Sequence, residues 1–146
     1  MRNISDSGYD DPDATVSFTE YERRNKDRHS SLKPVGWLVC TEGADFGRFY
    51  TLKEGRNLIG SGINMDVDLS HDLSITKENI AWIEFLEDTG SFMISPGNAR
   101  QLIYVNDDLI FKPTMLLNKD ILTMGETSLM LVACCDSRFS WRKIKH

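Results

Sequence analysis

The sequence predicts an all-β protein, a two-sheet β-sandwich of about ten to eleven strands. From Gly36 onward, short apolar runs alternate with turn residues, which is the pattern of an all-β chain. About ten such runs in about 100 residues are too many for one open sheet, so two packed sheets are expected. The sequence contains no helical repeat, coiled-coil heptad or low-complexity block.

Nine runs have the length and composition of strands. The breaks between them carry turn chemistry, as in Glu42-Gly43, Glu54-Gly55 and Asn106-Asp107. The expected strands are residues 36–41, 48–52, 57–59, 67–69, 81–85, 92–95, 102–105, 121–124 and 128–133.

The chain divides into three parts. Residues 1–35 have few apolar positions and no periodicity, so they cannot bury enough surface to offset their ordering entropy, and we expect a mostly disordered tail. Residues 36–135 form the sandwich. Residues 136–146 are basic and contain Phe139 and Trp141, which we expect to pack back on the domain rather than face a partner.

Composition narrows the class of protein. The 146 residues include 17 Lys or Arg and 22 Asp or Glu, for a net charge of −5, which does not favour binding to nucleic acid or a membrane surface, since both need a basic face. No apolar run reaches the roughly 18 residues of a spanning helix, and residues 1–6 lack the apolar region of a signal peptide. We expect a cytoplasmic protein without membrane insertion.

An enzyme is not expected, because the sequence has no nucleophile elbow, P-loop or His-Glu-x-x-His motif. The three histidines, His29, His71 and His146, are scattered. The three cysteines are an adjacent pair and one other, which is a poor disulfide framework and lacks metal-ligand spacing. Cys40, Cys134 and Cys135 are expected to pack as small apolar residues. We therefore expect no cofactor and no metal.

The most informative motifs lie between Asn57 and Ala81. They are Asn-Leu-Ile-Gly-Ser at 57–61, Asp-Val-Asp-Leu at 66–69 and Ser-Ile-Thr-Lys-Glu-Asn-Ile-Ala at 74–81. Further along come Ile-Tyr-Val-Asn-Asp at 103–107 and Leu-Asn-Lys-Asp-Ile-Leu-Thr-Met-Gly at 117–125. In this order and spacing, residues 36–135 resemble a forkhead-associated (FHA) domain of the bacterial type, a β-sandwich that binds phosphothreonine. The first strand, Gly-Trp-Leu-Val-Cys, and the late Phe139-Ser140-Trp141 strengthen the resemblance.

The resemblance implies a phosphopeptide site on loops at one end of the sandwich. A phosphate dianion needs several converging donors there, with an Arg fork among them. Thr76 keeps a hydroxyl, Lys77 a charge without the fork, and Arg100 a guanidinium from the neighbouring loop. The residues expected at the phosphopeptide site are Ser61, Thr76, Lys77, Asn79, Asn98, Arg100 and Gln101.

The sequence departs from the FHA pattern at several site positions. Ser61 stands where the family has Arg, Ile80 where related sequences have His, and Gln101-Leu102 where the family has Asn-Gly. Ile80 is expected to pack in the core. The phosphothreonine site is therefore predicted to be degenerate.

Two functions stay open at this point. In the first, the chain is an FHA adaptor or scaffold that binds a protein partner with weak or absent phosphothreonine dependence. In the second, it is a working phosphothreonine reader downstream of a Ser/Thr kinase. Thr15, in the acidic segment Asp10–Phe18, resembles a kinase acceptor, and phospho-Thr15 would then dock on the chain's own site and inhibit it. The resemblance implies a protein partner, with either a Ser/Thr kinase or a secretion-type assembly as context.

Overall fold

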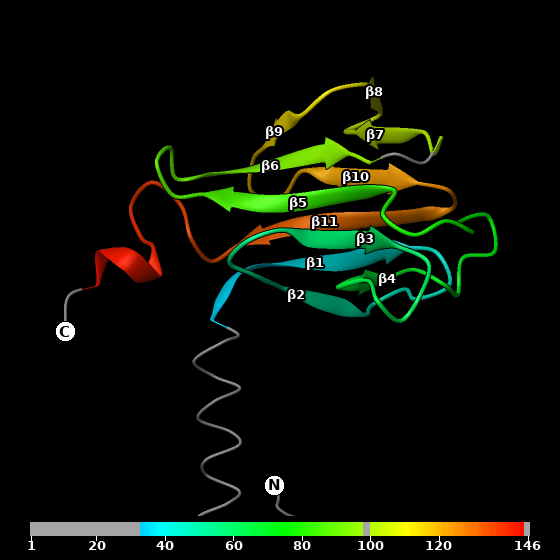
Figure 1. The fold of residues 1–146 in the computed structure, drawn as a ribbon, viewed down its shortest axis with the longest axis horizontal. Helices are drawn as coiled ribbons and strands as arrows, with labels where there is room; N and C mark the ends of the chain where they lie inside the picture. Colours follow the sequence, from blue (N-terminus) through cyan, green and yellow to red (C-terminus); the bar gives the residue numbers. More distant parts are fainter. Residues whose placement is uncertain (1–32, 98–99, 145–146) are drawn as a thin grey trace, which may run out of the picture. The chain divides into compact units, whose positions relative to one another are not determined.

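The computed structural model describes residues 33–97 and 100–144. These residues form two sheets in which most neighbouring strands are antiparallel (Figure 1). The six-stranded sheet has the order β2-β1-β11-β10-β7-β8 and the five-stranded sheet the order β4-β3-β5-β6-β9. The strands are β1 (Pro34–Glu42), β2 (Phe49–Lys53), β3 (Asn57–Gly60), β4 (Val67–Asp68), β5 (Ala81–Leu86), β6 (Ser91–Pro96), β7 (Ile103–Val105), β8 (Asp108–Ile110), β9 (Thr114–Leu116), β10 (Ile121–Met124) and β11 (Thr127–Ala133).

The all-β sandwich predicted from the sequence is confirmed, and the structure adds two strands that the sequence did not reveal. These are β8 and β9, of three residues each. A tight turn at Asn106 and Asp107, with φ of 50° and 71°, leads directly into β8, so the acidic turn residues concealed the strand that follows them. The expected disordered tail, which covers residues 1–35, lies almost wholly outside the described residues.

The core lies between the two sheets and follows from alternation along each strand. In β1, Leu38 and Cys40 are buried while Trp37 and Val39 are only partly covered on the outer face. Successive strand residues point to opposite faces, so one set fills the core and the other meets solvent. Ile80 is 1% exposed and belongs to this core, as predicted.

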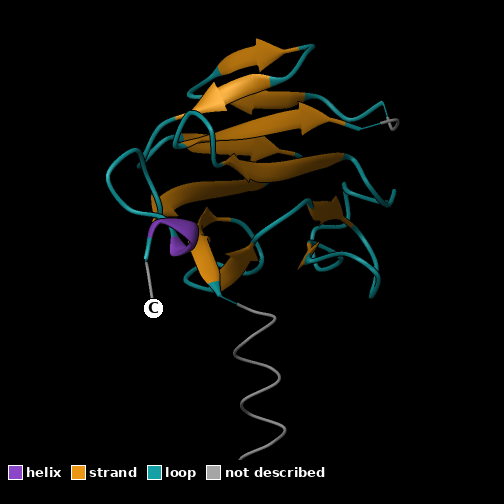
Figure 2. Ribbon diagram, turned by 60° about the vertical axis from the view of Figure 1, so that its left-hand side comes forward, coloured by secondary structure: helices purple, strands orange, loops and turns teal. Residues whose placement is uncertain are grey.

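The C-terminal segment packs on the domain, as predicted. A short 3-10 helix, η1 (Trp141–Lys143), lies beside the start of β1 (Figure 2). The indole Nε1 of Trp141 donates to the carbonyl of Pro34 at 2.6 Å, and the ring meets Phe139 edge-on at 5.3 Å between centroids. This hydrogen bond thereby connects the C-terminal segment to the start of the first strand.

The cysteines are all free, and two of them pack as small apolar residues. Cys40 and Cys135 are each 1% exposed, while Cys134 is partly exposed. Burial raises the pKa of the Cys135 thiol to about 11, and the same cause raises the pKa of Cys40. Both thiols stay protonated near neutral pH, which is the state of a packing residue rather than a nucleophile.

Within residues 33–97 and 100–144, no helix is long and apolar enough to cross a membrane. The same part of the chain contains no group of three or more His, Cys, Asp or Glu side chains placed to hold a metal ion.

Candidate functional site

Three loops meet at one end of the sandwich, on the right-hand side of Figure 1. They connect β3 to β4, β4 to β5 and β6 to β7. The N–H of Ser61 donates to the carbonyl of Lys77 at 2.9 Å, which ties the first loop to the second. The N–H of Gly97 donates to the carbonyl of Ile80 at 2.8 Å, which ties the third loop to the second. The β4–β5 loop is therefore held from both sides.

Two glycines allow the three loops to approach this closely. A Cβ placed on Gly60 would lie 2.7 Å from the backbone N of Asn79 and 2.8 Å from the carbonyl O of Lys77. A Cβ placed on Gly97 would overlap the carbonyl of Asn79. Neither glycine has a positive φ, so both are required by the close approach of backbones and not by an unusual conformation.

Asp72 fixes the middle of the β4–β5 loop to the turn between β10 and β11. One carboxylate oxygen accepts from the N–H and hydroxyl of Ser74, at 2.9 and 2.5 Å. The other accepts from the N–H of Glu126 at 2.9 Å and the hydroxyl of Thr127 at 2.6 Å. Burial alone would raise the pKa of Asp72, but these hydrogen bonds outweigh it and hold the pKa below its ordinary value.

Two further carboxylates brace the same end. Asp68 accepts from the N–H of Gly62 at 3.0 Å, and this hydrogen bond is the main cause that lowers the pKa of Asp68. Asp45, from the β1–β2 loop, contacts His71 of the β4–β5 loop at 2.8 Å and accepts from the hydroxyl of Tyr50 at 3.1 Å. The contact with His71 is the main cause that lowers the pKa of Asp45, and the hydrogen bond from Tyr50 lowers this pKa further.

These carboxylates predict acid sensitivity of the domain. The pKa values of Asp45, Asp68 and Asp72 lie below the ordinary 3.8 in the folded state, so the unfolded chain binds more protons at low pH. Their contribution to stability is complete above the unfolded-state pKa and is lost as the pH falls through the folded-state pKa. Urea midpoints measured from pH 7 to pH 2.5 should stay level to about pH 5 and fall below about pH 4. A midpoint that rises below pH 4 would contradict this assignment.

The predicted site residues lie on these loops, with different surroundings. Thr76 and Lys77 are exposed at the β4–β5 loop, and Arg100 is exposed on the β6–β7 loop. Gln101 is half-buried on the same loop, and Ser61 is half-buried on the β3–β4 loop. Asn98 and Thr15 lie outside the described residues.

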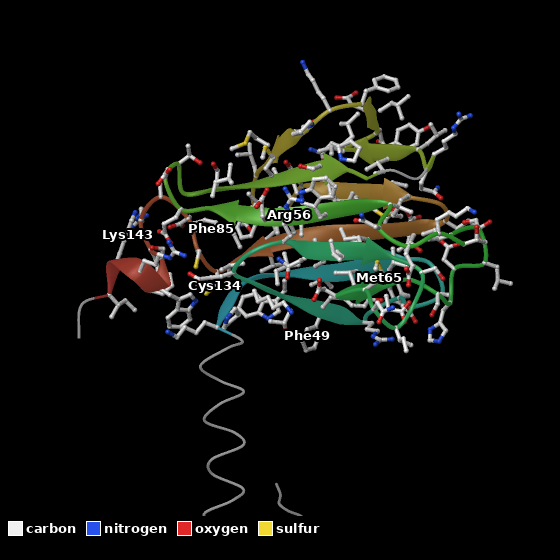
Figure 3. The ribbon with its side chains drawn as sticks, in the orientation of Figure 1. Phe49, Arg56, Met65, Phe85, Cys134 and Lys143 are labelled. Atoms are coloured by element: carbon white, nitrogen blue, oxygen red, sulfur yellow. The ribbon has the colours of Figure 1, made fainter. Side chains whose placement is uncertain are left out.

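Asn79 supports the β4–β5 loop through its backbone. Its φ is 52°, in the left-handed region that Asn adopts more readily than most residues. Its N–H lies 3.1 Å from the sulfur of Met65, which Figure 3 labels at the same end of the sandwich. Its side-chain oxygen is buried and has no hydrogen-bond partner among the described residues.

Glu78 also lies at this end of the sandwich, although the sequence did not single it out. A Cβ placed on Gly62 would lie 2.9 Å from the Oε2 of Glu78, so the carboxylate rests against the β3–β4 loop, one residue beyond Ser61. Its position beside Lys77 was visible in the sequence. Its orientation toward Gly62 depends on the conformation of two loops, which the sequence does not show.

Comparison with known proteins gives different results for sequence and structure. No family model matches the sequence, and no curated protein matches it. The structure resembles the FHA domain of the CT664 protein from Chlamydia trachomatis, with 25% identity, a TM-score of 0.58, and coverage of 66% of this chain and 95% of that one. It also resembles the cytoplasmic domain of the T3SS sorting platform protein PscD from P. aeruginosa, with 19% identity, a TM-score of 0.56, and coverage of 73% and 83%.

A third match is EmbR from Mycobacterium tuberculosis, in complex with a low affinity phosphopeptide. The identity is 16% and the TM-score 0.58, over 79% of this chain and 30% of that one. The part of the chain that the structure describes has the FHA-domain fold.

Proposed function

We propose that this chain is a non-catalytic FHA interaction module that binds a protein partner through the β3–β4, β4–β5 and β6–β7 loops. Phosphothreonine contributes weakly to this binding or not at all. The proposed setting is bacterial and cytoplasmic, in signalling or in the assembly of a larger complex.

The main support for this proposal is the charge distribution at the end where the three loops meet. The loops are rigidly joined, which is what a binding surface needs. The β3–β4 loop, however, offers a phosphate only the short neutral Ser61, and the carboxylate of Glu78 rests against Gly62 beside it. A phosphate dianion placed there would meet a negative charge where a phosphate reader needs a donor.

The missing charged donor at position 61 should weaken the binding of phosphate. Loss of one charged hydrogen bond to phosphate costs about 1.5–3 kcal/mol, or about one to two decades in affinity. Lys77 and Arg100 supply positive charge from the two other loops, and Lys77 does so without a bidentate fork. This leaves an attraction for anions that is weaker than that of an Arg-equipped site.

The structural neighbours are consistent with either kind of partner. EmbR is described in complex with a low affinity phosphopeptide, and PscD as a sorting platform protein. These ligands and roles belong to EmbR and PscD. At 16% and 19% identity, the similarity to this chain extends to the fold and not to a shared ligand.

A working phosphothreonine reader is the alternative function. This alternative is favoured because Thr76, Lys77 and Arg100 are exposed on loops that are hydrogen-bonded to one another. In that case phospho-Thr15, which lies outside the described residues, would be an internal ligand that closes the site.

Calorimetric titration with a peptide of residues 9–21, with and without phosphate on Thr15, separates the two functions. We expect phosphorylation to change the dissociation constant of the full chain by less than about tenfold, because one charged donor is missing and Glu78 opposes the phosphate. The double substitution Ser61→Arg with Glu78→Gln should then raise the preference for the phosphorylated peptide by about one to two decades.

Micromolar binding of the phosphorylated peptide alone, lost in Lys77→Ala, would replace the proposal with the alternative. If the double variant also fails to bind, the Thr15 peptide is the wrong ligand, and the same comparison has to be made with a phosphothreonine peptide library. Strong selection from that library by the unaltered chain would likewise overturn the proposal.

A further inference from the structure

Strand β2 forms an open edge of the six-stranded sheet. It pairs with β1 on one side, and no described strand pairs with it on the other. An open strand edge presents unpaired N–H and C=O groups and is a template for pairing with another chain. Figure 1 shows β2 along the lower border of the sandwich.

The hydrogen-bond pattern identifies which groups of β2 face outward. Cys40 of β1 turns both its N–H and its C=O to the β2 side, bonding Arg48 and Gly47 at 2.8 Å each. Bonding alternates along an antiparallel pair, so Leu38 also faces β2 and bonds its partner Tyr50. The N–H and C=O groups of Phe49 and Thr51 therefore point to the open edge.

Asn57 closes one end of this edge. Its side-chain oxygen accepts from the N–H of Lys53 at 3.0 Å, and its side-chain nitrogen donates to the carbonyl of Lys53 at 2.9 Å. Lys53 is the next outward-facing residue after Thr51, so the side chain of Asn57 takes the place of a partner strand there. The free edge is limited to Phe49 and Thr51.

The usual protection of an edge strand is weak in β2. Natural edges carry a proline, a bulge or a charged Lys that repels a second strand. β2 contains no proline, and the irregularities of its pairing with β1 lie beyond Phe49 and Thr51, at Gly47 and Arg48 and between Pro34 and Gly36. The ammonium of Lys53 is held by Asp66 at 2.9 Å, and the guanidinium of Arg48 lies over the ring of Tyr50 at 5.2 Å. Both cations thus turn toward their own domain.

An apolar surface adjoins the free edge. The side chain of Phe49 is 62% exposed and projects from β2 (Figure 3). Beside it, a shallow groove of about 350 Å³ is lined by Trp37, Val39, Gly47, Phe49 and Val132, on the outer face of β2, β1 and β11. An aromatic side chain left this exposed beside an apolar groove is typical of an interaction surface.

We propose that the β2 edge is a self-association surface that pairs with β2 of a second copy of this chain. Antiparallel pairing centred on Tyr50 places Phe49 opposite Thr51 of the partner copy, and Thr51 opposite its Phe49. Every outward-facing N–H and C=O of these two residues then finds a partner, which gives four hydrogen bonds across a two-fold axis.

The same register brings the apolar surfaces together. The two Phe49 side chains lie diagonally across the pair on one face, at a spacing that aromatic rings can bridge. The grooves of the two copies then form one continuous apolar surface. Because the free edge is short, the interface is small and the dimer is weak, with dissociation in about the 0.1–1 mM range.

Sedimentation equilibrium of the full chain up to about 1 mM tests this surface. The mean mass should rise toward twice the monomer mass with concentration. Phe49→Glu should abolish the rise, whereas Phe111→Glu, at a phenylalanine beyond β8 that is even more exposed (80%), should not change it. Thr51→Pro removes an N–H that the fold does not use, so it should abolish association and leave the circular dichroism spectrum unchanged.

Hydrogen exchange by NMR gives an independent measurement that needs no variant. The amides of Phe49 and Thr51 should exchange more slowly as the concentration rises, while the amides of Tyr50 and Leu52, already bonded to β1, should not change. A chain that stays monomeric at about 1 mM overturns the proposal. So does association that survives Phe49→Glu and Thr51→Pro in folded protein.

Discussion

Asp72→Ala should lower the unfolding free energy of this domain more than either Gly60→Ala or Gly55→Ala. The carboxylate is 6% exposed and accepts four hydrogen bonds, from Ser74, Glu126 and Thr127. Its removal leaves the buried hydroxyl of Thr127 and three partly buried donors without this partner, and hydrogen bonds to a charged group contribute about 1.5–3 kcal/mol each without being additive. We expect a loss of about 3–5 kcal/mol of unfolding free energy and a Tm lower by about 12 °C or more.

Urea unfolding of the two proteins at pH 7 measures this loss. Asp72→Asn is the matched control, because it keeps the shape and two acceptor lone pairs but replaces the charge and one oxygen by an amide that donates. It should lose about half as much stability as Asp72→Ala, since the acceptor toward one pair of donors is preserved. An alanine variant within about 1 kcal/mol of the unaltered chain would show that solvent replaces the carboxylate.

The Asp72 cluster bears on the proposed function because it joins two distant segments at the end of the sandwich where the three loops meet. Thr127 begins β11, 55 residues after Asp72, and the hydrogen bond between them holds the β4–β5 loop against the six-stranded sheet. Lys77 and Thr76 lie on the same loop. A loss of this anchor should therefore disturb both stability and the geometry of the proposed binding surface.

Much of the sheet architecture could be predicted from alternation alone. Strands such as β1 and β11 carry long apolar runs between clear turn residues, and their existence was evident in the sequence. β8 was not evident because it begins inside the acidic run Asp107-Asp108, and β9 was not evident because Pro113 directly precedes it. Short strands contribute too little periodicity to outweigh the turn chemistry beside them.

The site was predictable where it depends on local pattern and hidden where it depends on long-range contact. Gly60, Ser61, Thr76 and Lys77 stand in a recognisable order, so their convergence on one end could be expected. Asp72 lies in an ordinary polar loop sequence, and nothing near it indicates a partner 55 residues away. The carboxylate of Glu78 matters only because the loop turns it toward Gly62.

The glycine at position 60 has a physical role that the FHA resemblance did not explain. It is buried at the end of β3, and three backbone atoms of the β4–β5 loop surround the place where a Cβ would stand. These atoms belong to Lys77, Glu78 and Asn79, at 2.8, 3.0 and 2.7 Å. Backbone cannot move aside as a flexible side chain can, so the loop conformation depends on the missing Cβ.

Gly60→Ala should therefore displace the β4–β5 loop without unfolding the sandwich. We expect a loss of about 1–3 kcal/mol from overpacking. The amide resonances of Thr76 to Asn79 should shift in the NMR spectrum, because the added methyl group pushes directly on their backbone. Any ligand of the loop end should bind at least about tenfold more weakly, since its contacts on Thr76 and Lys77 move relative to the other two loops.

Gly55→Ala is the matched control for this substitution. Gly55 lies in the turn between β2 and β3 with a φ of 87°, and no atom lies within 4 Å of the position that its Cβ would take, so alanine costs about 1 kcal/mol of backbone strain there. The two variants should lose comparable stability, but only Gly60→Ala should shift the amides of the β4–β5 loop. If Gly55→Ala shifts them equally, the effect comes from general destabilisation and the close packing of Gly60 does not position the loop.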